Sequence, residues 1–387
     1  MIYTEKINPL LLKKSRKVIK EIEQQPLKWI ETFNVVFDNR NELKEFTKNV
    51  NKVIFNGAGT SECIGLTIVN ELNKHEDRRY LSVSSPDICT HPDYYYKNEP
   101  TCLVSFSRGG SSPESQGAIE HADALIDDIK HLIITCNPNS WITEYALAHK
   151  DKTFLLILPE GTYDQSFAMT SSFTCMVLAG YLSFNLDKLD DLKNDIEMLS
   201  KAGKNILDNY SKYLFDIVDD FNFEKYVTLG NGNLKALAKE SEIKMLEVCA
   251  GNLMTWSDTI PGFRHGPAVI TKNCGKTLLT IFYENDVYSD NYVNDLIKEI
   301  KDLYPYSNNR IIAIGINNNP IIDEYADYFV NVGINIKNSA LLAIPYILVV
   351  QILMVYKGWK FGIGADLPFN FKRKYGILTK IYPFKSL

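Results

Sequence analysis

Two kinds of stretch alternate along the chain. Short runs rich in Val, Ile, Leu and Phe are separated by longer stretches in which apolar residues recur with the period of a helix. Short apolar strands that alternate with helices are typical of a parallel sheet, because its strands are buried on both faces. The pattern therefore predicts an α/β fold.

The order of these stretches occurs twice. In each half, four predicted strands precede a long apolar helix, which covers Ser166–Phe184 in the first half and Asn338–Tyr356 in the second. The predicted strands are Val53–Asn56, Cys102–Phe106, Leu132–Cys136 and Phe154–Leu158, then Tyr226–Leu229, Thr277–Phe282, Arg310–Gly315 and Tyr328–Val332. We therefore expect two pseudo-symmetric, doubly wound parallel-sheet domains, with ligand sites at the carboxyl ends of their strands.

The remaining segments set the predicted domain boundaries. An amphipathic helix that carries Leu10–Ile30 is expected to wrap a neighbouring half or subunit, and a long charged helix over Asp187–Asp220 is expected to join the halves. The resulting division is an N-terminal helical segment over 1–45, domains over 46–205 and 206–365, and a tail over 366–387.

Composition and charge exclude several classes of protein. The apolar stretch Ala340–Tyr356 is short for a bilayer, which needs about 20 residues, and is interpreted as a buried helix rather than a membrane span. With 42 Lys+Arg against 47 Asp+Glu, the net charge of −5 does not favour nucleic-acid binding.

The chain starts without the apolar core of a secretion signal. Its seven cysteines lack zinc-site spacing, so a cytoplasmic protein with reduced thiols is expected.

Glycine turns follow the first predicted strand of each half. The turns are Gly57–Gly59 and Gly230–Gly232, 173 residues apart, but a dinucleotide fingerprint requires a third glycine where this chain has Glu62 and Lys235. We therefore expect no nicotinamide or flavin cofactor, and no metal. Thr60 and Ser61 stand instead where a helix begins, so their hydroxyls and the free backbone N–H groups can converge on an anion.

A second hydroxyl-rich turn covers residues Ser105–Ser115 after the next strand. Ser112 is placed to cap a helix with Pro113 at its first position and Ser115 as a partner. A capped helix without any ligand would explain this turn equally well. Two such turns beside each other in one sheet favour a phosphate site.

These turns resemble those of a known family. Ser107–Ser112 resembles the Ser-x-Ser-Gly-x-Ser/Thr phosphosugar signature of sugar isomerase (SIS) domains, and Gly59-Thr60-Ser61 resembles the first sugar-contacting turn of that flavodoxin-like fold. The segments 57–66, 105–115, 164–176 and 261–267 together resemble the tagatose-6-phosphate ketose/aldose isomerase group, whose members are also described as galactosamine-6-phosphate deaminases. The resemblance implies two SIS domains in tandem, with Ala168 and its neighbours forming a wall that faces the sugar.

The chain departs from this family at two places. Gly109 stands where the signature has its second serine, and a backbone N–H or the guanidinium of Arg108 is expected to compensate. The tail contains a basic cluster, Lys372–Lys374, that is not typical of the group.

The catalytic candidates lie in the second half. Aldose–ketose isomerisation needs a carboxylate that reaches two carbons and a group that passes protons for ring opening. Glu240, Lys244 and Glu247 are spaced i, i+4 and i+7, so they share one helix face; without further information a solvated ladder of ion pairs fits that face as well. The resemblance implies that Glu247 is the base, with Lys244 at the matching offset.

His265 is the candidate for proton transfer during ring opening. It lies among turn residues in Pro261–Pro267, and a histidine exchanges protons near neutral pH. In the resembling isomerases the matching histidine reaches the site of the neighbouring subunit, which implies a homodimer or a higher homo-oligomer.

We therefore expect an enzyme that converts galactosamine 6-phosphate into tagatose 6-phosphate and ammonia. Two alternatives stay open: a tagatose-6-phosphate ketose/aldose isomerase that releases no ammonia, and a SIS module that senses phosphosugars without catalysis. A sensor needs the serine turns but has no use for Glu247 and His265, so these residues favour an enzyme.

Overall fold

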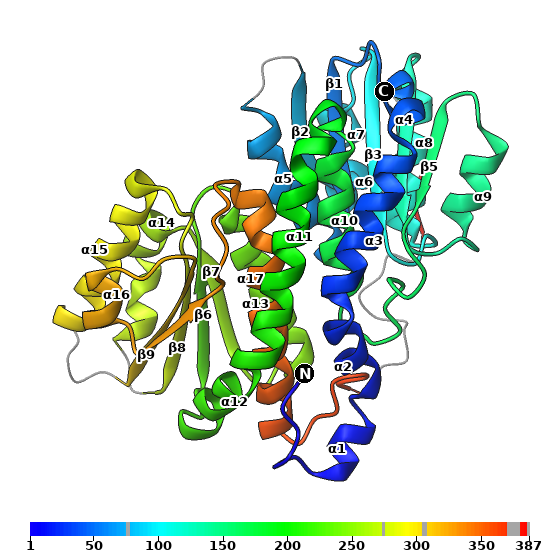
Figure 1. Cartoon of the computed structure of the whole chain (residues 1–387). Coiled ribbons are helices and arrows are strands. Elements are labelled where there is room, and N and C mark those ends of the chain that lie inside the picture. Colours follow the sequence, from blue (N-terminus) through cyan, green and yellow to red (C-terminus); the bar gives the residue numbers. More distant parts are fainter. Residues whose placement is uncertain (75–77, 273–274, 304–307, 370–379, 385–387) are drawn as a thin grey trace. The chain divides into compact units, whose positions relative to one another are not determined.

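The computed structural model describes residues 1–74, 78–272, 275–303, 308–369 and 380–384 and contains two parallel five-stranded sheets (Figure 1). Each sheet is the centre of a compact unit. The first-sheet unit comprises residues 27–164, 171–196 and 370–387, and the second-sheet unit comprises 1–26, 165–170 and 197–369.

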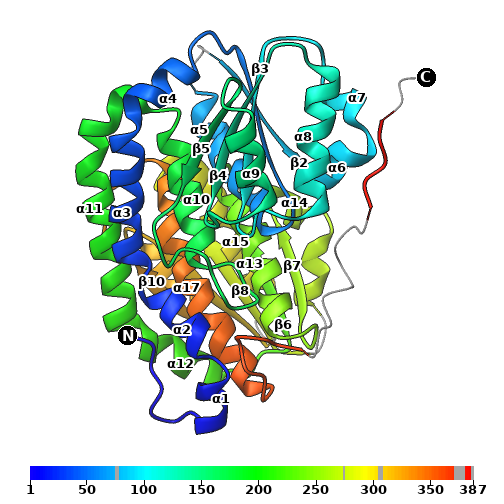
Figure 2. The same cartoon turned by 90° about the vertical axis from the view of Figure 1, so that its right-hand side faces the viewer.

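The first sheet has the strand order β2-β1-β3-β4-β5, with every neighbouring pair parallel. The helices α5 and α10 contact each other on one face, and α6, α7, α8 and α9 lie on the other (Figures 1 and 2). The bounds are β1 (Lys52–Gly57), β2 (Arg79–Ser84), β3 (Thr101–Ser107), β4 (Ile129–Thr135), β5 (Thr153–Ile157), α5 (Thr60–Leu72), α6 (Ser85–Thr90), α7 (Pro92–Tyr95), α8 (Pro113–Leu125), α9 (Trp141–Ala148) and α10 (Ser171–Leu182).

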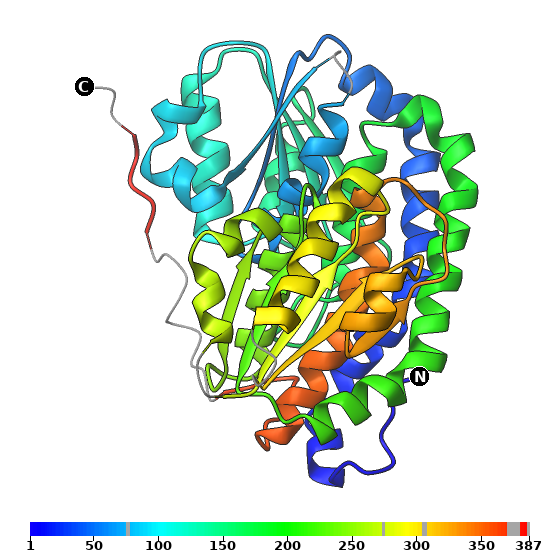
Figure 3. The ribbon, with the colours of Figure 1, turned by 90° about the vertical axis from the view of Figure 1, so that its left-hand side faces the viewer.

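The second sheet has the order β10-β9-β8-β6-β7, again parallel throughout. The helices α13 and α17 cover one face, and α14, α15 and α16 cover the other, which faces the viewer in Figure 3. The bounds are β6 (Lys225–Leu229), β7 (Met254–Asp258), β8 (Thr277–Phe282), β9 (Asn309–Gly315), β10 (Tyr328–Asn331), α13 (Leu234–Val248), α14 (Ile260–Arg264), α15 (Val287–Leu303), α16 (Pro320–Tyr325) and α17 (Ser339–Lys360).

The two sheets confirm the predicted pseudo-symmetric, doubly wound fold. In each, the first strand along the chain lies between the second and the third, so the strand order reverses between β1 and β3 and between β6 and β8. The turns that follow β1 and β6 are equally tight. A Cβ atom on Gly57 would lie 2.5 Å from the Ser61 carbonyl carbon, and one on Gly230 would lie 2.4 Å from the Leu234 carbonyl oxygen. Only glycine fits either turn.

Among the described residues, α17 alone is long and apolar enough to cross a membrane by length and composition. Its most apolar 18-residue window is buried completely inside the protein. Burial of this apolar surface stabilises the second-sheet unit through the hydrophobic effect. The prediction of a buried helix at this position is confirmed.

The prediction missed the edge strands β2 and β7. Both lie at sheet edges, and their residues are mostly half-buried or exposed, so they lack the continuous apolar runs that marked the other strands. The apolar helix of the first half starts at Ser171 rather than Ser166. Asp164 sets this start, because its carboxylate accepts hydrogen bonds from the backbone N–H groups of Ser171 and Ser172.

The helices outside the sheets also differ in part from the prediction. The expected N-terminal helix is broken into several helices, and the expected linker helix is nearly continuous but contains a π-helical turn (η2). Their bounds are α1 (Pro9–Lys13), α2 (Arg16–Glu23), α3 (Gln25–Asp38), α4 (Arg40–Phe46), η1 (Leu186–Lys188), α11 (Leu189–Asn205), η2 (Ile206–Tyr210) and α12 (Ser211–Asp220), with η3 (Pro267–Thr271) following α14. The predicted domain boundaries stay predictions.

Residues 380–384 of the tail belong to the first-sheet unit. They run beside α8, where Ile381 approaches Gly117 and the ring of Phe384 lies 6.4 Å from that of His121 (Figure 2). The predicted basic cluster Lys372–Lys374 lies outside the described residues. Six cysteines in the described part of the chain are unpaired, and five of them are buried, as expected for reduced thiols.

Asp290 on α15 makes the stability of the second-sheet unit depend on pH. Burial, followed by repulsion from Glu284 and Asp286, raises the pKa of its carboxyl to about 6. Because the pKa is higher in the folded state than in the unfolded state, stability falls as the pH rises from about 4 to about 6. We expect Asp290→Asn to raise the free energy of unfolding at pH 7.5 by about 1–2 kcal/mol.

Chemical denaturation at pH 4.5 and pH 7.5 measures this effect, with Asp295→Asn as the control. Asp295 is an exposed carboxylate on the same helix. The gain from Asp290→Asn should disappear at the lower pH. An equal gain at both pH values would contradict the assigned cause.

Candidate active site

The turn after β1 opens α5 with two buried hydroxyl side chains. Gly59 is the N-cap residue at φ 59°, and it provides no side-chain cap for the first turn of the helix. Thr60 and Ser61 follow and are 6 % and 5 % exposed. Helix N-termini carry partial positive charge, so this turn suits an anion.

The turn after β3 is held by its own hydroxyl groups. Ser107 accepts a hydrogen bond from the backbone N–H of Gly110 at 3.0 Å. Ser112 caps α8 by accepting from the N–H of Ser115 at 3.3 Å, and the two hydroxyl oxygens are 2.8 Å apart. Pro113 occupies the first turn of the helix. The predicted N-cap is confirmed, and Arg108 and Gly109 lie within this turn.

Two asparagines that the sequence did not single out support these turns. Asn56, on β1, donates to the Ser105 hydroxyl on β3 at 3.0 Å and accepts from Ser85 at 2.9 Å. Asn137, after β4, donates to the carbonyl of Gly109 at 2.9 Å. These bonds join the loops at the carboxyl end of the first sheet, which fixes the geometry of the two turns relative to each other.

Gly109 and Gly110 differ sharply in what their positions tolerate. A Cβ atom on Gly109 would meet only the Tyr163 hydroxyl at 3.8 Å, whereas one on Gly110 would lie 2.1 Å from the Ser140 hydroxyl, at a φ of 70°. We expect Gly110→Ala to destabilise the protein by about 2–4 kcal/mol and Gly109→Ala by less than about 0.5 kcal/mol. Thermal unfolding of the two variants checks these two predictions. An equal loss of stability in both variants would contradict them.

The segment with Ala168 belongs to the second-sheet unit and forms a loop, not the predicted start of a helix. Glu21, on α2, accepts hydrogen bonds from the N–H groups of Gln165 at 2.6 Å and Ser166 at 3.0 Å, and from the Ser166 hydroxyl. Ala168 is fully buried, and its carbonyl accepts from the Ser166 hydroxyl at 3.1 Å. Glu21 is thus a positioning residue for this loop. The sequence gives one indication of this role, because Glu21 is a carboxylate that stands among the apolar residues on the buried face of α2.

Glu240, Lys244 and Glu247 share one face of α13, as predicted. The Lys244 ammonium lies 3.8 Å from a Glu240 carboxylate oxygen and donates a hydrogen bond to Glu247. Glu240 and Lys244 are 0 % and 1 % exposed, whereas Glu247 is 30 % exposed. Because two of its three members are buried, this row is not a solvated ladder of ion pairs.

Burial of the charged pair has an energetic cost that points to a function. Desolvation of a buried ion pair often cancels its Coulomb attraction, so such pairs contribute little to folding and occur often at functional sites. Lys244 lies between two carboxylates and compensates one negative charge. Glu247, the outer member, stays accessible to a ligand.

His265 lies at the C-terminus of α14, with its side chain exposed. Its backbone N–H donates to the Gly262 carbonyl at 3.1 Å, which closes the short helix. A cavity of about 300 Å³ next to it is lined by Ile260, Pro261, Arg264, His265 and Tyr292. The histidine is therefore presented to solvent rather than packed in the core.

The predicted site residues fall into two groups. Gly59, Thr60, Ser61 and Ser107–Ser112 belong to the first-sheet unit, and Ala168, Lys244, Glu247 and His265 belong to the second-sheet unit. In the described part of the chain, no group of three or more His, Cys, Asp or Glu side chains could hold a metal ion. The expectation that the protein uses no metal and no cofactor stays a prediction.

The fold and these turns define a tandem SIS-domain protein, and comparisons with known proteins agree. The chain is 34 % identical to D-galactosamine-6-phosphate deaminase AgaS of Shewanella sp. strain ANA-3, over 94 % of this chain and 91 % of that protein. It is 33 % identical to the AgaS protein of Escherichia coli over 78 % of both chains. No protein-family model matches the chain.

Solved structures show the same likeness. A Clostridium novyi NT protein assigned as a tagatose-6-phosphate ketose/aldose isomerase superposes with a TM-score of 0.89 at 36 % identity, covering 97 % of both chains. The tagatose-6-phosphate ketose/aldose isomerase of Escherichia coli gives a TM-score of 0.85 at 27 % identity, over 95 % of this chain and 97 % of that one. The chain belongs to the AgaS family of SIS-domain proteins, within the phosphosugar isomerase and deaminase group.

Proposed function

We propose that the protein is a deaminating isomerase of hexosamine 6-phosphates, which converts galactosamine 6-phosphate into tagatose 6-phosphate and ammonia. The observation that carries this proposal is the accessible carboxylate of Glu247 at the end of the buried pair Glu240 and Lys244. The names of the AgaS relatives support the choice of substrate.

The phosphate group binds at the two hydroxyl-rich turns of the first-sheet unit. Thr60 and Ser61 offer hydroxyls at a helix N-terminus, and Ser107–Ser112 adds hydroxyl and backbone N–H groups. Gly109 contributes its backbone where a serine would stand, and the Arg108 guanidinium supplies the positive charge that phosphate binding favours. Ala168 and its neighbours form the wall that faces the sugar.

The reaction then needs a proton carried from C2 to C1. His265 passes the proton that opens the pyranose ring. Glu247 then removes the C2 proton while the aldehyde oxygen at C1 takes up a proton from the C2 ammonium group, which gives an enolamine. Return of that proton to C1 gives an imine at C2. Water adds to the imine carbon and the C–N bond breaks, which leaves the C2 carbonyl of tagatose 6-phosphate and ammonia. Lys244 donates a hydrogen bond to Glu247 and orients its carboxylate before it accepts the proton.

The protein acts in the cytoplasm as a homodimer or a higher homo-oligomer, and His265 serves the site of the neighbouring subunit. The exposure of His265 beside a cavity in its own unit supports this arrangement. A histidine that completes a site in a partner must be presented at the surface.

A substrate panel tests the proposed function. The purified protein is incubated with galactosamine 6-phosphate, glucosamine 6-phosphate and tagatose 6-phosphate, and ammonia and sugar products are measured. We expect ammonia from galactosamine 6-phosphate at the highest rate. Interconversion of tagatose 6-phosphate with its aldose without any ammonia from the amino sugars would instead establish a plain isomerase. Binding without turnover would establish a phosphosugar sensor.

A further inference from the structure

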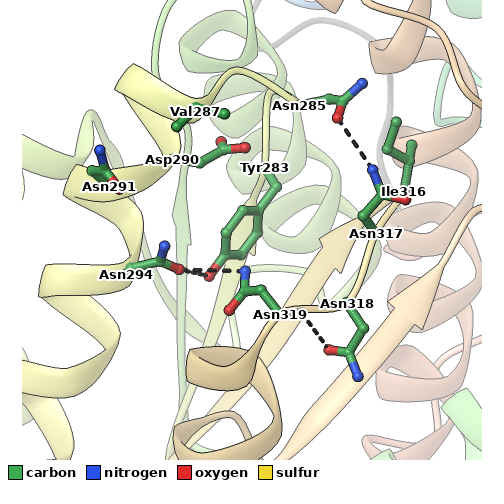
Figure 4. A pocket seen from close by; sticks show the side chains of 10 residues that line it. All are labelled: Tyr283, Asn285, Val287, Asp290, Asn291, Asn294, Ile316, Asn317, Asn318 and Asn319. Atoms are coloured by element: carbon green, nitrogen blue, oxygen red, sulfur yellow. Dashed lines mark hydrogen bonds between the residues drawn. The ribbon is translucent and has the colours of Figure 1, made fainter.

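A polar cavity of about 240 Å³ lies at the carboxyl ends of β8 and β9, and none of the site residues assigned above lines it (Figure 4). Its walls come from the loops that follow these two strands and from the first turns of α15. Six of its ten lining residues are asparagines. In doubly wound sheets, ligands bind at this end of the strands.

The side chains in the cavity are held in a connected network. The Tyr283 hydroxyl donates to the Asn294 amide oxygen at 2.8 Å, and the Asn319 amide contacts the same oxygen at 3.5 Å. Across the cavity, Asn317 donates to Asn285 at 3.4 Å. Figure 4 shows Tyr283 at the centre of these amides. The network orders groups that can both donate and accept hydrogen bonds.

Asparagine amides match the chemistry of sugar hydroxyl groups. An amide offers two donors and an acceptor oxygen without net charge, and a hydroxyl likewise both donates and accepts. Amides lining a small cavity therefore suit a polyhydroxyl ligand. A volume of about 240 Å³ is slightly below the range of about 300–1,000 Å³ that is typical of small-molecule sites, which fits one sugar ring rather than an oligosaccharide.

The charge of the cavity excludes a phosphate. Among the described residues that line it, the only carboxylate is that of Asp290, and none is Lys or Arg. Asp290 accepts a hydrogen bond from the Glu284 backbone at 3.0 Å, and the carboxylates of Glu284 and Asp286 add negative charge nearby. A phosphorylated sugar would be repelled, whereas an ammonium group would be attracted.

The corresponding loops of the first sheet are joined by hydrogen bonds to backbone carbonyl groups. At the carboxyl ends of β3 and β4, Asn137 donates to the Gly109 carbonyl at 2.9 Å and the Ile142 N–H donates to the Gly110 carbonyl at 2.9 Å. The loops after β8 and β9 are joined across the cavity by amide side chains instead. The two halves thus differ in how these loops are joined.

We propose that this cavity is a second ligand site of the protein, which binds a single unphosphorylated monosaccharide and prefers an amino sugar to a neutral hexose. The amides hold the hydroxyl groups, and the Asp290 carboxylate pairs with the ammonium group. The site goes beyond the proposed reaction, because its ligand lacks the phosphate that the serine turns require.

Ligand-observed NMR titrations of the full-length protein test the proposal with galactosamine, galactose and galactose 6-phosphate. We expect galactosamine to bind about tenfold more tightly than galactose, as one charge-assisted hydrogen bond would give, and galactose 6-phosphate not to bind at this cavity. Asn317→Trp, which fills the cavity from an exposed position, should weaken galactosamine binding at least tenfold. Asn209→Trp, at an exposed asparagine of the same unit, is the matched control and should leave binding unchanged.

Galactosamine binding that persists in Asn317→Trp would overturn the proposal, and so would the absence of binding by any unphosphorylated sugar. Binding of free galactosamine at the proposed active site is recognised because an excess of galactose 6-phosphate displaces it and Asn317→Trp does not weaken it. If the protein shows no deaminase activity but binds galactosamine in a way that Asn317→Trp weakens, the proposed function is contradicted and the second ligand site is not.

Discussion

Replacing Glu247 by glutamine is expected to lower turnover of galactosamine 6-phosphate by about 10³-fold, while KM changes by less than about threefold. The substitution keeps the size and the hydrogen-bonding oxygen of the side chain but removes the base. Lys244 still finds an acceptor at this position, and the pair it forms with Glu240 stays intact. Binding of the phosphate depends on the serine turns, so affinity for the substrate should be retained.

Glu242→Gln is the matched control for this experiment. Glu242 lies on the same helix and accepts a hydrogen bond from the Ser257 hydroxyl, outside the row of Glu240, Lys244 and Glu247. Both variants lose one negative charge from α13, but only Glu247→Gln should lose turnover. Comparable rates in the two variants would remove Glu247 from the role of base.

His265→Asn is expected to lower turnover of the cyclic substrate by about 10²-fold. Asparagine keeps a polar side chain at the end of α14 but cannot exchange a proton near neutral pH. The loss should be much smaller with the 4,5-dideoxy analogue of galactosamine 6-phosphate, which lacks the hydroxyl groups that close a pyranose or a furanose ring and needs no ring opening. Steady-state rates with both substrates measure this difference, and an equal loss with both would contradict a role in ring opening.

Mixing the two inactive variants tests whether His265 acts across subunits. In a mixed dimer of Glu247→Gln and His265→Asn, one site combines an intact Glu247 with an intact His265 from the other chain. We expect subunit exchange to restore about one quarter of wild-type activity, since half of the dimers are mixed and each has one complete site. No recovery after exchange would place both residues in the site of one chain.

The buried parts of the fold could be predicted because their signals are local. Eight of the ten strands in the described part of the chain were predicted from short apolar runs, and the shared face of Glu240, Lys244 and Glu247 followed from helical spacing. The edge strands β2 and β7 were missed because exposed positions interrupt their apolar pattern. Burial of Lys244 could not be predicted, because it depends on which elements pack around α13.

The supporting residues of the candidate site were missed for a different reason. Glu21 and Asn137 bind backbone groups 144 and 28 residues away along the chain, and no spacing in the sequence relates them to their partners. The predicted start of α10 was wrong. Asp164 accepts hydrogen bonds from the first N–H groups of this helix, so the helix begins only after the loop that Glu21 holds. Hydroxyl-rich turns are visible in a sequence, but the side chains that fix their geometry come from distant elements.

One reaction in D₂O tests the central claim most directly. Galactosamine 6-phosphate is converted by the wild-type protein, and ammonium release and deuterium at C1 of the ketose product are measured in the same sample. The proposed mechanism predicts one ammonium per tagatose 6-phosphate and deuterium at C1, because the proton on Glu247 exchanges with solvent before its return. Consumption of the sugar without ammonium, or ammonium release without a ketose 6-phosphate, would contradict it.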